Sequence, residues 1–505
     1  MLSRVSTFAI DGVEPRHVAV EVDIRAGLPA FTIVGLGDVA VRESRERIRA
    51  AIQNSGFKFP QSRITANLAP ASLRKAGPGF DAALALAVLA ASKQIPPGPL
   101  TDVAVFGELS LGGELRVAPG VLAVAEGARQ AGIPRLVVPR ERAREAALVD
   151  GIEVAGVSGL AEAVDAIIGL RTPPLPRAQA ASSTPVAEDL ADVRGHAAPL
   201  LALQIAAAGG HNLMLEGPPG TGKTMLARRL PSILPPLTRD QALEVTRIHS
   251  IAGVHAGGLV QRRPFRAPHH TISAAGLVGG GSPPKPGEAS LAHLGVLFLD
   301  ELSEFQRTTL EALRQPLEDG HVTIVRAQRA LTFPTRVMLV AATNPCPCGY
   351  AGAGDRCTCS ELDLRRHRRR LSGPLLDRMD LLVGVERPDE QELRGRASID
   401  SATVRARVAE ARARQLARLR GTAAKCNGDL DAGLVRACVR LERRALAALG
   451  DAYSAGALSA RGRHRVLRVA QTIADLDRHD RVSESDVLLA LSLRQRSPGE
   501  ALLAA

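Results

Sequence analysis

Aromatic side chains are scarce in this chain of 505 residues. The sequence has no Trp and two Tyr, and aromatic residues make up 2% of it. Proteins that bind single-stranded nucleic acid without sequence preference stack the bases on aromatic rings. The composition therefore argues against a stacking platform, and any contact with nucleic acid is expected to be made mainly to phosphates.

Long apolar runs are also missing. A membrane-spanning helix needs about 18 or more apolar residues with few charges, and the sequence has no such run. Residues 1–5 do not begin the apolar segment of a secretory signal peptide. We expect a cytoplasmic protein with no membrane segment.

Lysine is rare, although the chain is basic. Six of the 64 Lys and Arg residues are lysines, and the net charge is +12. A basic surface favours a nucleic-acid partner such as DNA, because it neutralises phosphates. The alternative is that an Ala- and Arg-rich composition only reflects a GC-rich genome.

One lysine lies in the octapeptide GPPGTGKT, which fits the phosphate-binding P-loop pattern G-x-x-x-x-G-K-[ST]. Residues 212–216 before it predict a strand, and residues 225–230 after it predict the start of a helix. Glycines let the backbone wrap around phosphates, and the helix N-terminus adds partial positive charge. We expect Lys223 to contact the β- and γ-phosphates of ATP and Thr224 to hold Mg²⁺. The expected nucleotide-binding residues are Gly217, Pro218, Pro219, Gly220, Thr221, Gly222, Lys223 and Thr224.

Polar residues follow two further predicted strands. After the apolar run at 296–299, Asp300 is expected to hold Mg²⁺ through water and Glu301 to polarise the attacking water. The alternative for this pair is an acidic cluster at a helix N-terminus. The strand predicted at 337–342 runs into Thr-Asn-Pro, which makes Asn344 the expected first sensor of the γ-phosphate.

Two arginines are predicted to complete an ATPase site. Arg378 lies between acids before an apolar strand, where oligomeric ATPases place the arginine that reaches a neighbour's γ-phosphate. A local Arg–Asp pair is the alternative. Arg461, at the start of a long predicted helix, is the expected second sensor.

The length and the pattern of elements predict three domains of an α/β protein. The expected division is a mixed first domain at 1–170, a Pro- and Ala-rich linker at 171–187, a nucleotide-binding core at 188–390 and a helical lid at 391–505. Expected elements include strands at 18–22 and 31–34 and helices at 41–53, 80–91 and 403–420.

Four of the six cysteines cluster with the spacing C-x-C-x8-C-x-C, at Cys346, Cys348, Cys357 and Cys359. In a cytosolic protein such a cluster favours a metal over disulfides. Four thiolates suit tetrahedral Zn²⁺ in a closed structural site. Each C-x-C pair is tighter than the usual C-x2-C, so a redox-sensitive or metal-free cluster is the alternative.

These motifs, in this order, resemble the AAA+ ATPases and, more narrowly, the Mg-chelatase-like YifB/ComM family. The narrower resemblance spans residues 3–495. It rests on the stretches GGHNL (209–213), ILPPL (233–237), RPFRAPHHT (263–271), PKPGE (284–288) and NPCPCG (344–349).

The resemblance implies an N-terminal domain shaped like the Lon protease domain, a P-loop AAA+ core and a C-terminal helical lid. It also implies a homo-oligomeric ring, a hexamer in ComM-type members, that uses ATP and Mg²⁺. Those members are motors that drive branch migration of DNA, a helicase-type activity, during natural transformation.

The Lon-like domain is expected to lack protease activity. Lon-type proteases use a Ser nucleophile and a Lys base. Gly79 stands at the serine position and Leu122 at the lysine position. Ser72 and Lys75 lie nearby but out of register.

Residues 320–333 predict a hairpin with its turn at 326–329. In the AAA+ clade with a hairpin before the first sensor, that hairpin points into the ring pore, so Arg326 and Arg329 are expected to contact DNA phosphates. An exposed basic turn is the alternative. Residues 276–281 are expected to be flexible, as a pore loop or a linker, and the basic run 365–370 to meet DNA or an acidic subunit face. The adjacent residues His269 and His270 are expected to form a packed, hydrogen-bonded pair.

The sequence thus predicts a ring-forming ATPase that moves on DNA and remodels branched intermediates. One alternative is a motor that inserts Mg²⁺ into a porphyrin, which the shared motifs favour and the basic charge argues against. A nucleotide-switched scaffold with little turnover is another, which the Asp300–Glu301 pair argues against.

Overall fold

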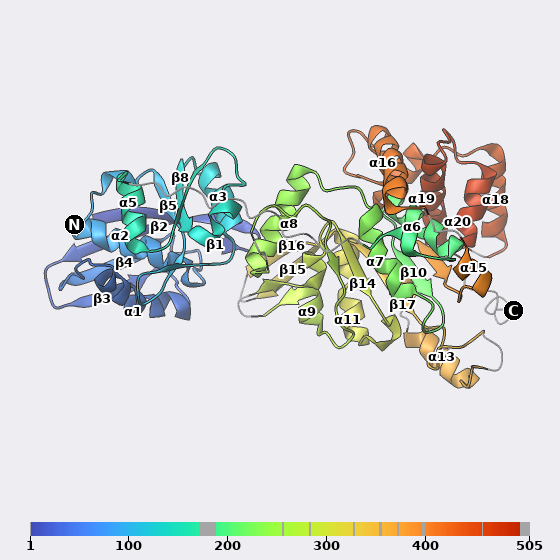
Figure 1. Cartoon of the computed structure of the whole chain (residues 1–505), viewed down its shortest axis with the longest axis horizontal. Coiled ribbons are helices and arrows are strands. Elements are labelled where there is room, and N and C mark those ends of the chain that lie inside the picture. The colour runs from blue at the N-terminus through green and yellow to red at the C-terminus, as the bar shows by residue number, and fades with distance from the viewer. Residues whose placement is uncertain are drawn as a thin grey trace.

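The computed structural model describes residues 2–170, 188–254, 257–281, 284–326, 329–352, 356–370, 373–395, 399–456 and 458–494. The predicted linker at 171–187 lies outside these residues. Figure 1 shows an elongated molecule with an N-terminal sheet at one end, a second sheet in the middle and a helical C-terminal part at the other end.

The N-terminal part is built on a mixed seven-stranded sheet in the order β3-β4-β2-β1-β5-β8-β9. Its strands are β1 (Leu2–Asp11), β2 (Glu14–Arg25), β3 (Ala30–Val34), β4 (Arg63–Ala69), β5 (Val103–Val105), β8 (Arg135–Pro139) and β9 (Glu153–Val157), with a small ribbon of β6 (Glu108–Leu109) and β7 (Leu115–Arg116). The strands predicted at 18–22 and 31–34 are confirmed in β2 and β3.

Helices cover this sheet because they carry apolar faces. Helix α2 (Asp81–Ala91) is almost entirely Ala, Leu and Val, and it is buried along its whole length against β1, β2 and α1 (Val39–Asn54). Both helices confirm the predictions at 41–53 and 80–91. The other helices of this part are α3 (Val121–Gln130), α4 (Ala143–Ala146) and α5 (Leu160–Ile168).

The central part holds a five-stranded sheet in the order β11-β14-β17-β10-β18, with all neighbours parallel. Its strands are β11 (Phe265–Arg266), β14 (Val296–Leu299), β17 (Met338–Thr343), β10 (Leu213–Glu216) and β18 (Leu381–Gly384). Parallel strands buried on both faces read as apolar runs, and β14 and β17 are buried at every residue. Because the strands are parallel, their carboxyl ends all lie on the same side of the sheet. Open α/β folds bind ligands outside these carboxyl ends.

Helices α6 (Ala197–Gly209), α7 (Lys223–Ile233) and α8 (Arg239–Ala252) precede or connect these strands. The shorter helices of the central part are α9 (Ala274–Val278), α10 (Glu288–Leu291), α11 (Arg307–Ala312), α12 (Arg314–Asp319), α13 (Glu361–Arg370) and α14 (Gly373–Leu376). Short 3₁₀ turns lie at Pro78–Phe80, Gly98–Leu100, Arg140–Arg142, Leu190–Asp192, Leu302–Glu304 and Asn427–Asp429.

Two ribbons project from the central part. The predicted hairpin is confirmed: β15 (His321–Arg326) pairs antiparallel with β16 (Arg329–Pro334), and Arg326 faces Arg329 in the register. Within the glycine-rich segment 276–281, α9 ends and β12 (Gly279–Gly280) pairs with β13 (Lys285–Pro286). A Cβ on Gly287 would overlap the backbone of this segment, so the two backbones pack closely.

The C-terminal part is helical, as predicted, and its arginine-rich helix is α16. Its helices are α15 (Glu390–Arg394), α16 (Ser401–Arg418), α17 (Ala432–Cys438), α18 (Arg443–Ser454), α19 (Ala460–Leu476) and α20 (Glu484–Ser492). Helices α16 and α19 pack on α6, so one apolar core runs from the central sheet into these helices. Among the helices of the described ranges, none is long and apolar enough to cross a membrane.

The N-terminal part packs on α8 of the central part. Helix α3 lies against α8, and the buried carboxylate of Glu145 accepts hydrogen bonds from the Ser250 hydroxyl of α8 and from the Leu122 N–H, at 3.2 Å for the latter. Arg247 pairs with Glu126 at 3.2 Å. Figure 1 shows the hairpin β15–β16 beside the N-terminal sheet.

Candidate nucleotide-binding site

The P-loop joins β10 to α7 in the predicted strand–loop–helix order. Gly220 and Gly222 have φ of 76° and 86°, a region that favours glycine. A Cβ on Gly217 would overlap the carbonyl oxygen of Val385. The sequence pattern of glycines therefore matches three positions where the backbone needs them.

Lys223 begins α7, and its ammonium lies between the P-loop and the end of β17. Nζ donates to the carbonyl oxygens of Gly217 at 2.6 Å and Pro218 at 2.8 Å, and to Oδ1 of Asn344 at 3.1 Å. The side chain is 9% exposed. Burial lowers the pKa of Lys223, and the nearby acids Asp300, Glu216 and Glu301 oppose that shift.

Thr224 and Asp300 face each other across the site. The Thr224 hydroxyl donates to Oδ2 of Asp300 at 2.7 Å, and the N–H of Glu301 donates to Oδ1 of Asp300 at 3.0 Å. Hydroxyl and carboxylate oxygens are the hard ligands that Mg²⁺ takes in phosphate-transfer sites. The donor set therefore fits the predicted metal.

Glu301 has an unusual backbone for a glutamate, with φ of 51° and ψ of 50°. Such conformations cost free energy in non-glycine residues and concentrate at functional sites. The side chain is 58% exposed, and its Oε2 lies 3.5 Å from Nδ1 of His270.

His270 is a neighbour of Glu301 that the sequence analysis missed. The predicted His269–His270 pair is confirmed, with ring centroids 4.1 Å apart and a hydrogen bond between His269 and Thr271 at 2.9 Å. The approach to Glu301 depends on β11 lying next to β14, and the sheet order is not readable from the sequence.

Asn344 follows β17 and has two anchors. Its side-chain oxygen accepts from Lys223, as described, and its main-chain oxygen lies 2.9 Å from Nε2 of His367 on α13. His367 is 4% exposed. It belongs to the basic run 365–370, where it faces inward while Arg366, Arg369 and Arg370 are exposed.

Arg378 lies by the amino end of β10, whereas its own P-loop follows the carboxyl end of that strand. Its carbonyl oxygen accepts from the side chain of Asn212 at 3.0 Å, and Asn212 precedes β10, whereas the P-loop follows β10. The strand between them has four residues, which at about 3.3 Å per residue separates the two ends by about 13 Å. The guanidinium of Arg378 pairs with Glu318 on α12.

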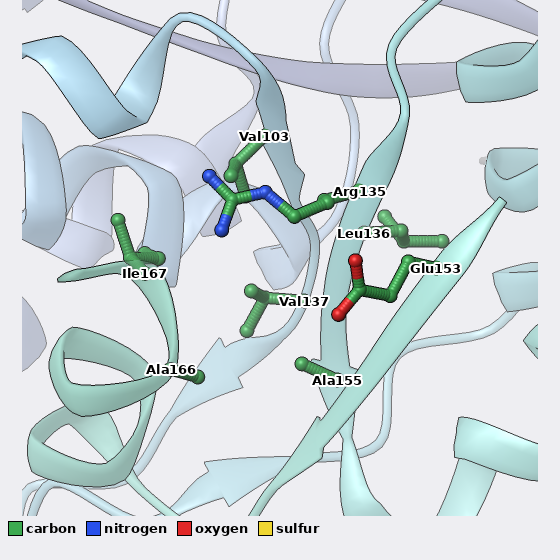
Figure 2. A pocket seen from close by; sticks show the side chains of 8 residues that line it. All are labelled: Val103, Arg135, Leu136, Val137, Glu153, Ala155, Ala166 and Ile167. Atoms are coloured by element: carbon green, nitrogen blue, oxygen red, sulfur yellow. The ribbon is translucent and has the colours of Figure 1, made fainter. Parts of the chain in front are cut away.

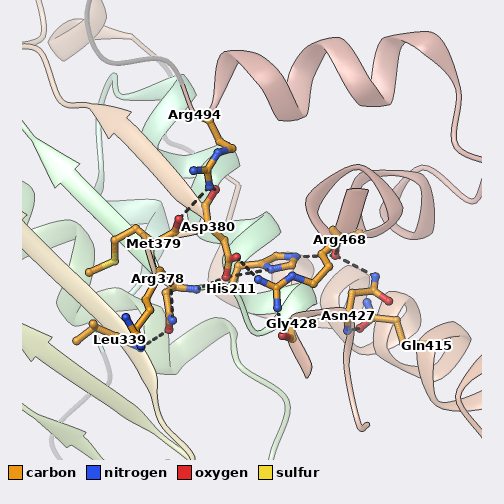
Figure 3. Close-up of polar contacts among 12 residues, drawn as sticks. His211, Leu339, Arg378, Met379, Asp380, Gln415, Asn427, Gly428, Arg468 and Arg494 are labelled. Carbon is orange, nitrogen blue, oxygen red and sulfur yellow. Dashed lines mark hydrogen bonds and ion pairs between the residues drawn. The ribbon is translucent and has the colours of Figure 1, made fainter. Parts of the chain in front are cut away.

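A buried polar network ties this segment to the C-terminal helices, as Figure 3 shows. Asp380 accepts from Arg468 of α19 at 2.7 Å and from the Asn212 N–H at 3.2 Å, and His211 lies 3.6 Å away. Burial alone raises the pKa of Asp380, but Arg468 and His211 outweigh it and the pKa is lowered. Arg494 binds the carbonyl oxygens of Met379 at 2.9 Å and Asp380 at 3.0 Å.

Arg461 lies in the first turn of α19 and is exposed. Arg465, one turn further along, is buried, and burial lowers its pKa, while the charges of Asp380 and Asp377 raise it and that of Arg461 lowers it. Further along α19, Arg468 pairs at 2.7 Å with Asp380, two residues after Arg378.

The four clustered cysteines converge, with all four sulfurs within 4.8 Å of one another. Cys346 Sγ lies 3.3 Å from Cys348 Sγ and 3.9 Å from Cys357 Sγ, and the latter two are 3.7 Å apart. A disulfide requires about 2.05 Å, whereas a tetrahedral zinc site with Zn–S of about 2.3 Å places its sulfurs about 3.8 Å apart.

Backbone N–H groups point at these sulfurs. The Ala351 N–H donates to Cys346 Sγ at 3.2 Å. The Tyr350 N–H lowers the pKa of Cys348 to about 6. The remaining two cysteines lie elsewhere, Cys426 buried and Cys438 half-buried.

The N-terminal part fills the position of the missing protease dyad with apolar groups. A Cβ on Gly79 would overlap the ring of Phe106, and Phe106 packs in the same apolar cluster as Leu122. Lys75, the out-of-register lysine, is fully buried and donates to the carbonyl oxygen of Pro70. A serine at position 79 would need Phe106 to move.

A small hollow in the same part lies far along the chain from the P-loop. Figure 2 shows it between β8, β9 and α5, with Arg135 and Glu153 among mostly apolar walls. Its lining residues are Val103, Arg135, Leu136, Val137, Glu153, Ala155, Ala166 and Ile167.

Models of the Mg-chelatase family match most of the chain. The models described as "Subunit ChlI of Mg-chelatase", "Magnesium chelatase, subunit ChlI" and "Magnesium chelatase, subunit ChlI C-terminal" match residues 20–142, 189–393 and 398–494. Over a smaller region, the N-terminal part is similar to Lon protease 2 of Thermus thermophilus, with 31% identity over 128 residues, 24% of this chain and 16% of that protein.

Two relatives match nearly the full length. The uncharacterized protein YifB of Escherichia coli is 43% identical over 498 residues, which cover 98% of this chain and 97% of YifB. The competence protein ComM of Haemophilus influenzae is 40% identical over 509 residues, which cover 98% of this chain and 97% of ComM. With its AAA+ sheet, Lon-like N-terminal part and helical C-terminal part, this chain belongs to the YifB/ComM family of Mg-chelatase-like proteins.

Proposed function

We propose that this protein is an ATP-hydrolysing, ring-forming AAA+ motor that acts on DNA, in branch migration or a related helicase activity. One observation carries the ATPase part. Lys223, the Thr224–Asp300 pair and Asn344 converge at the carboxyl edge of the central sheet through hydrogen bonds of 2.7 to 3.1 Å. Glu301 directly follows Asp300 in the chain. The proposed phosphate anchor, metal-binding pair and base therefore all lie at the carboxyl ends of the strands.

In the proposed reaction the P-loop binds the phosphates of ATP through its N–H groups and Lys223. Thr224 and Asp300 would hold Mg²⁺, which neutralises phosphate charge when it is bound. Glu301 accepts a proton from the attacking water. Asn344, as the first sensor, contacts the γ-phosphate. The exposed side chain of Glu301 is accessible to such a water.

We propose that Arg378 acts on the ATP of a neighbouring subunit. Arg378 lies by the amino end of β10, and the length of this strand, about 13 Å, separates that end from the P-loop. This position supports action in trans, as expected in a hexameric ring. Arg461 lies in the first turn of α19, the helix whose Arg468 pairs with Asp380, and we assign it to the second sensor, acting from the lid. The proposed division of the chain is at 1–170, 171–187, 188–390 and 391–505.

DNA is proposed as the partner on three grounds. The chain is basic, with a net charge of +12. The full-length relative ComM is named a competence protein. The hairpin β15–β16 is present with Arg326 and Arg329 beside its turn, and we assign these two arginines to phosphate contacts. A cytoplasmic location fits such a role.

We propose further that the four clustered cysteines bind one Zn²⁺. Their sulfur–sulfur distances of 3.3 to 3.9 Å suit a tetrahedral thiolate site, and zinc is the common metal for four cysteines.

The second candidate is a chelatase-type motor that inserts Mg²⁺ into a porphyrin. It is favoured by the family models, which are named after a magnesium chelatase subunit. DNA binding that weakens steeply with salt would favour the first candidate, because phosphate contacts release counterions.

The deciding experiment is steady-state ATP hydrolysis with and without single-stranded and branched DNA, with Lys223→Ala as the blank. We expect hydrolysis that DNA stimulates and that the blank lacks, because Lys223 anchors the phosphates. Hydrolysis indifferent to DNA would favour the chelatase-type candidate. Absence of hydrolysis in the wild-type protein would contradict the ATPase assignment.

A further inference from the structure

The cysteine cluster starts at the nucleotide site itself. Cys346 is the second residue after Asn344 and is 1% exposed, and Cys348 follows two residues later. The second arm, Cys357 and Cys359, ends two residues before α13 begins at Glu361. A metal held by both arms would therefore link the residue after β17 to the start of α13.

The loop between the two arms packs on the P-loop. Gly349 has φ of 86°, and a Cβ built on it would lie 2.7 Å from Cδ of Pro219 and 3.9 Å from Cγ of Asn344. The backbone at Gly349 therefore packs on the phosphate-binding loop with no space for a side chain against Pro219, and Asn344 lies next to it.

Helix α13 returns to the same sensor. His367 lies two turns into this helix, is buried, and places Nε2 at 2.9 Å from the main-chain oxygen of Asn344. Because a carbonyl oxygen only accepts hydrogen bonds, the ring donates through Nε2–H. The chain thus leaves Asn344, passes through both pairs of cysteines and comes back to Asn344 through His367.

This closed path gives the metal a role in positioning. Oδ1 of Asn344 accepts a hydrogen bond from Lys223 at 3.1 Å, so a shift of Asn344 would also disturb the lysine that we propose for phosphate binding. Without the metal, α13 is tied to the end of β17 only by the connecting chain and by the His367 hydrogen bond to Asn344. A misplacement of about 1 Å in a catalytic site costs about 100-fold in rate.

We propose that the cysteine-bound metal is a structural part of the ATPase site: it sets the position of Asn344 through the Gly349–Pro219 contact and the His367 hydrogen bond, so that hydrolysis, but not nucleotide binding, depends on the metal. This proposal rests on the proposed ATPase function. His367 is a positioning residue in it, because it acts through Asn344.

The test compares three variants with the wild-type full-length protein. Cys357→Ser/Cys359→Ser removes one arm, His367→Ala removes the hydrogen bond, and His367→Gln keeps an N–H donor. Cys438→Ser changes a thiol outside the cluster and is the matched control. The measurements are bound zinc per chain, ATP turnover, affinity for a fluorescent ATP analogue, and amide exchange of residues 217–222 and 343–346 without nucleotide.

We expect about one zinc per chain in the wild type, Cys438→Ser and both His367 variants, and none in the double cysteine variant. Turnover falls about 100-fold in the double cysteine variant and in His367→Ala, while analogue affinity is retained. His367→Gln recovers most of the turnover. Amide exchange at 343–346 rises in the double cysteine variant.

Two outcomes would overturn the proposal. One is a double cysteine variant that lacks zinc yet keeps wild-type turnover and wild-type exchange at 343–346. The other is a His367→Ala variant with full zinc and full turnover, which needs no loss of metal and so covers the case in which the cysteine variant fails to fold. If the wild-type protein hydrolyses no ATP, the proposed function fails, and the exchange measurement alone decides the positioning role.

Discussion

At the scale of single residues, the site combines one strained acid with several fixed partners. Glu301 has a left-handed backbone, with φ of 51°, and lies between β14 and the 3₁₀ turn at Leu302–Glu304. Its main-chain N–H donates to Oδ1 of Asp300 at 3.0 Å, which orients the carboxylate that we propose for Mg²⁺ binding. Strain of this kind holds a side chain ready for its role before the substrate binds.

Changing Glu301→Gln removes the proton acceptor and leaves the size of the side chain unchanged. We expect turnover to fall by about 10²- to 10⁴-fold, while ATP binding is kept because Lys223 and the P-loop are intact. Single-turnover hydrolysis and titration with a fluorescent nucleotide measure the two quantities. The matched control is Glu304→Gln, an exposed acid on the same loop. Wild-type turnover by Glu301→Gln would remove Glu301 from the mechanism.

At the scale of secondary-structure elements, the hairpin β15–β16 is the clearest feature outside the ATP site. Its six residue pairs run from His321–Pro334 to Arg326–Arg329. The turn of the N-terminal β1–β2 pair lies close by, since a Cβ on Gly12 would be 3.3 Å from the main-chain oxygen of Thr332. The Lon-like part therefore contacts the middle of β16, where Thr332 pairs with Thr323, and we expect the tip to face DNA.

Replacing both Arg326 and Arg329 with Ala tests this assignment. If each arginine contacts one phosphate of single-stranded DNA, the slope of log affinity against log salt falls by about 1.4 in magnitude. Fluorescence anisotropy of labelled DNA at several salt concentrations gives the slope. Arg420→Ala, an exposed arginine after α16, is the control. An unchanged slope, together with a loss in Arg366→Ala/Arg369→Ala, would move the DNA contact to α13.

At the scale of the whole molecule, the P-loop and Arg378 lie at opposite ends of β10, and we propose that they are the two halves of a site shared between subunits. The P-loop, Asp300 and Asn344 lie at the carboxyl ends of the strands, and Arg378 lies at the amino ends. There Arg378 pairs with Glu318, and the nearby Asp380 pairs with Arg468. A chain with complementary half-sites on opposite edges completes them by head-to-tail contact, which closes into a ring when the rotation allows. The same network joins Arg378 to α19, so movement of the helical part would move the arginine.

Mixing two inactive variants tests this arrangement. Arg378→Ala is expected to lose about 10³- to 10⁵-fold in turnover, and Lys223→Ala to lose ATP binding. In an equal mixture, about a quarter of the interfaces of a head-to-tail ring combine an intact P-loop with an intact Arg378, so hydrolysis should return in part. Coupled-enzyme ATPase assays of the mixture measure it. Mixing Arg378→Ala with the double variant Lys223→Ala/Arg378→Ala must give no recovery. Absence of recovery in the first mixture would contradict action in trans.

The sequence by itself determined the local features of this protein. The P-loop, the acids after β14 and the asparagine after β17 are each contiguous with an apolar strand, so their local geometry follows from a short segment. The same holds for the hairpin, the helical C-terminal part and the spacing of the cysteines. The resemblance to a known family then indicated that these features belong to one fold.

Only the tertiary structure decided which distant residues meet. His270 approaches Glu301 because β11 pairs with β14, and His367 reaches Asn344 because α13 folds back over the cysteine loop. Glu318 and Arg378 are 60 residues apart. Strand order and helix docking arise from long-range packing of apolar surface, which has no local signature. For that reason the partners of the candidate site residues, and their positions at opposite ends of the parallel strands, became visible only in the folded chain.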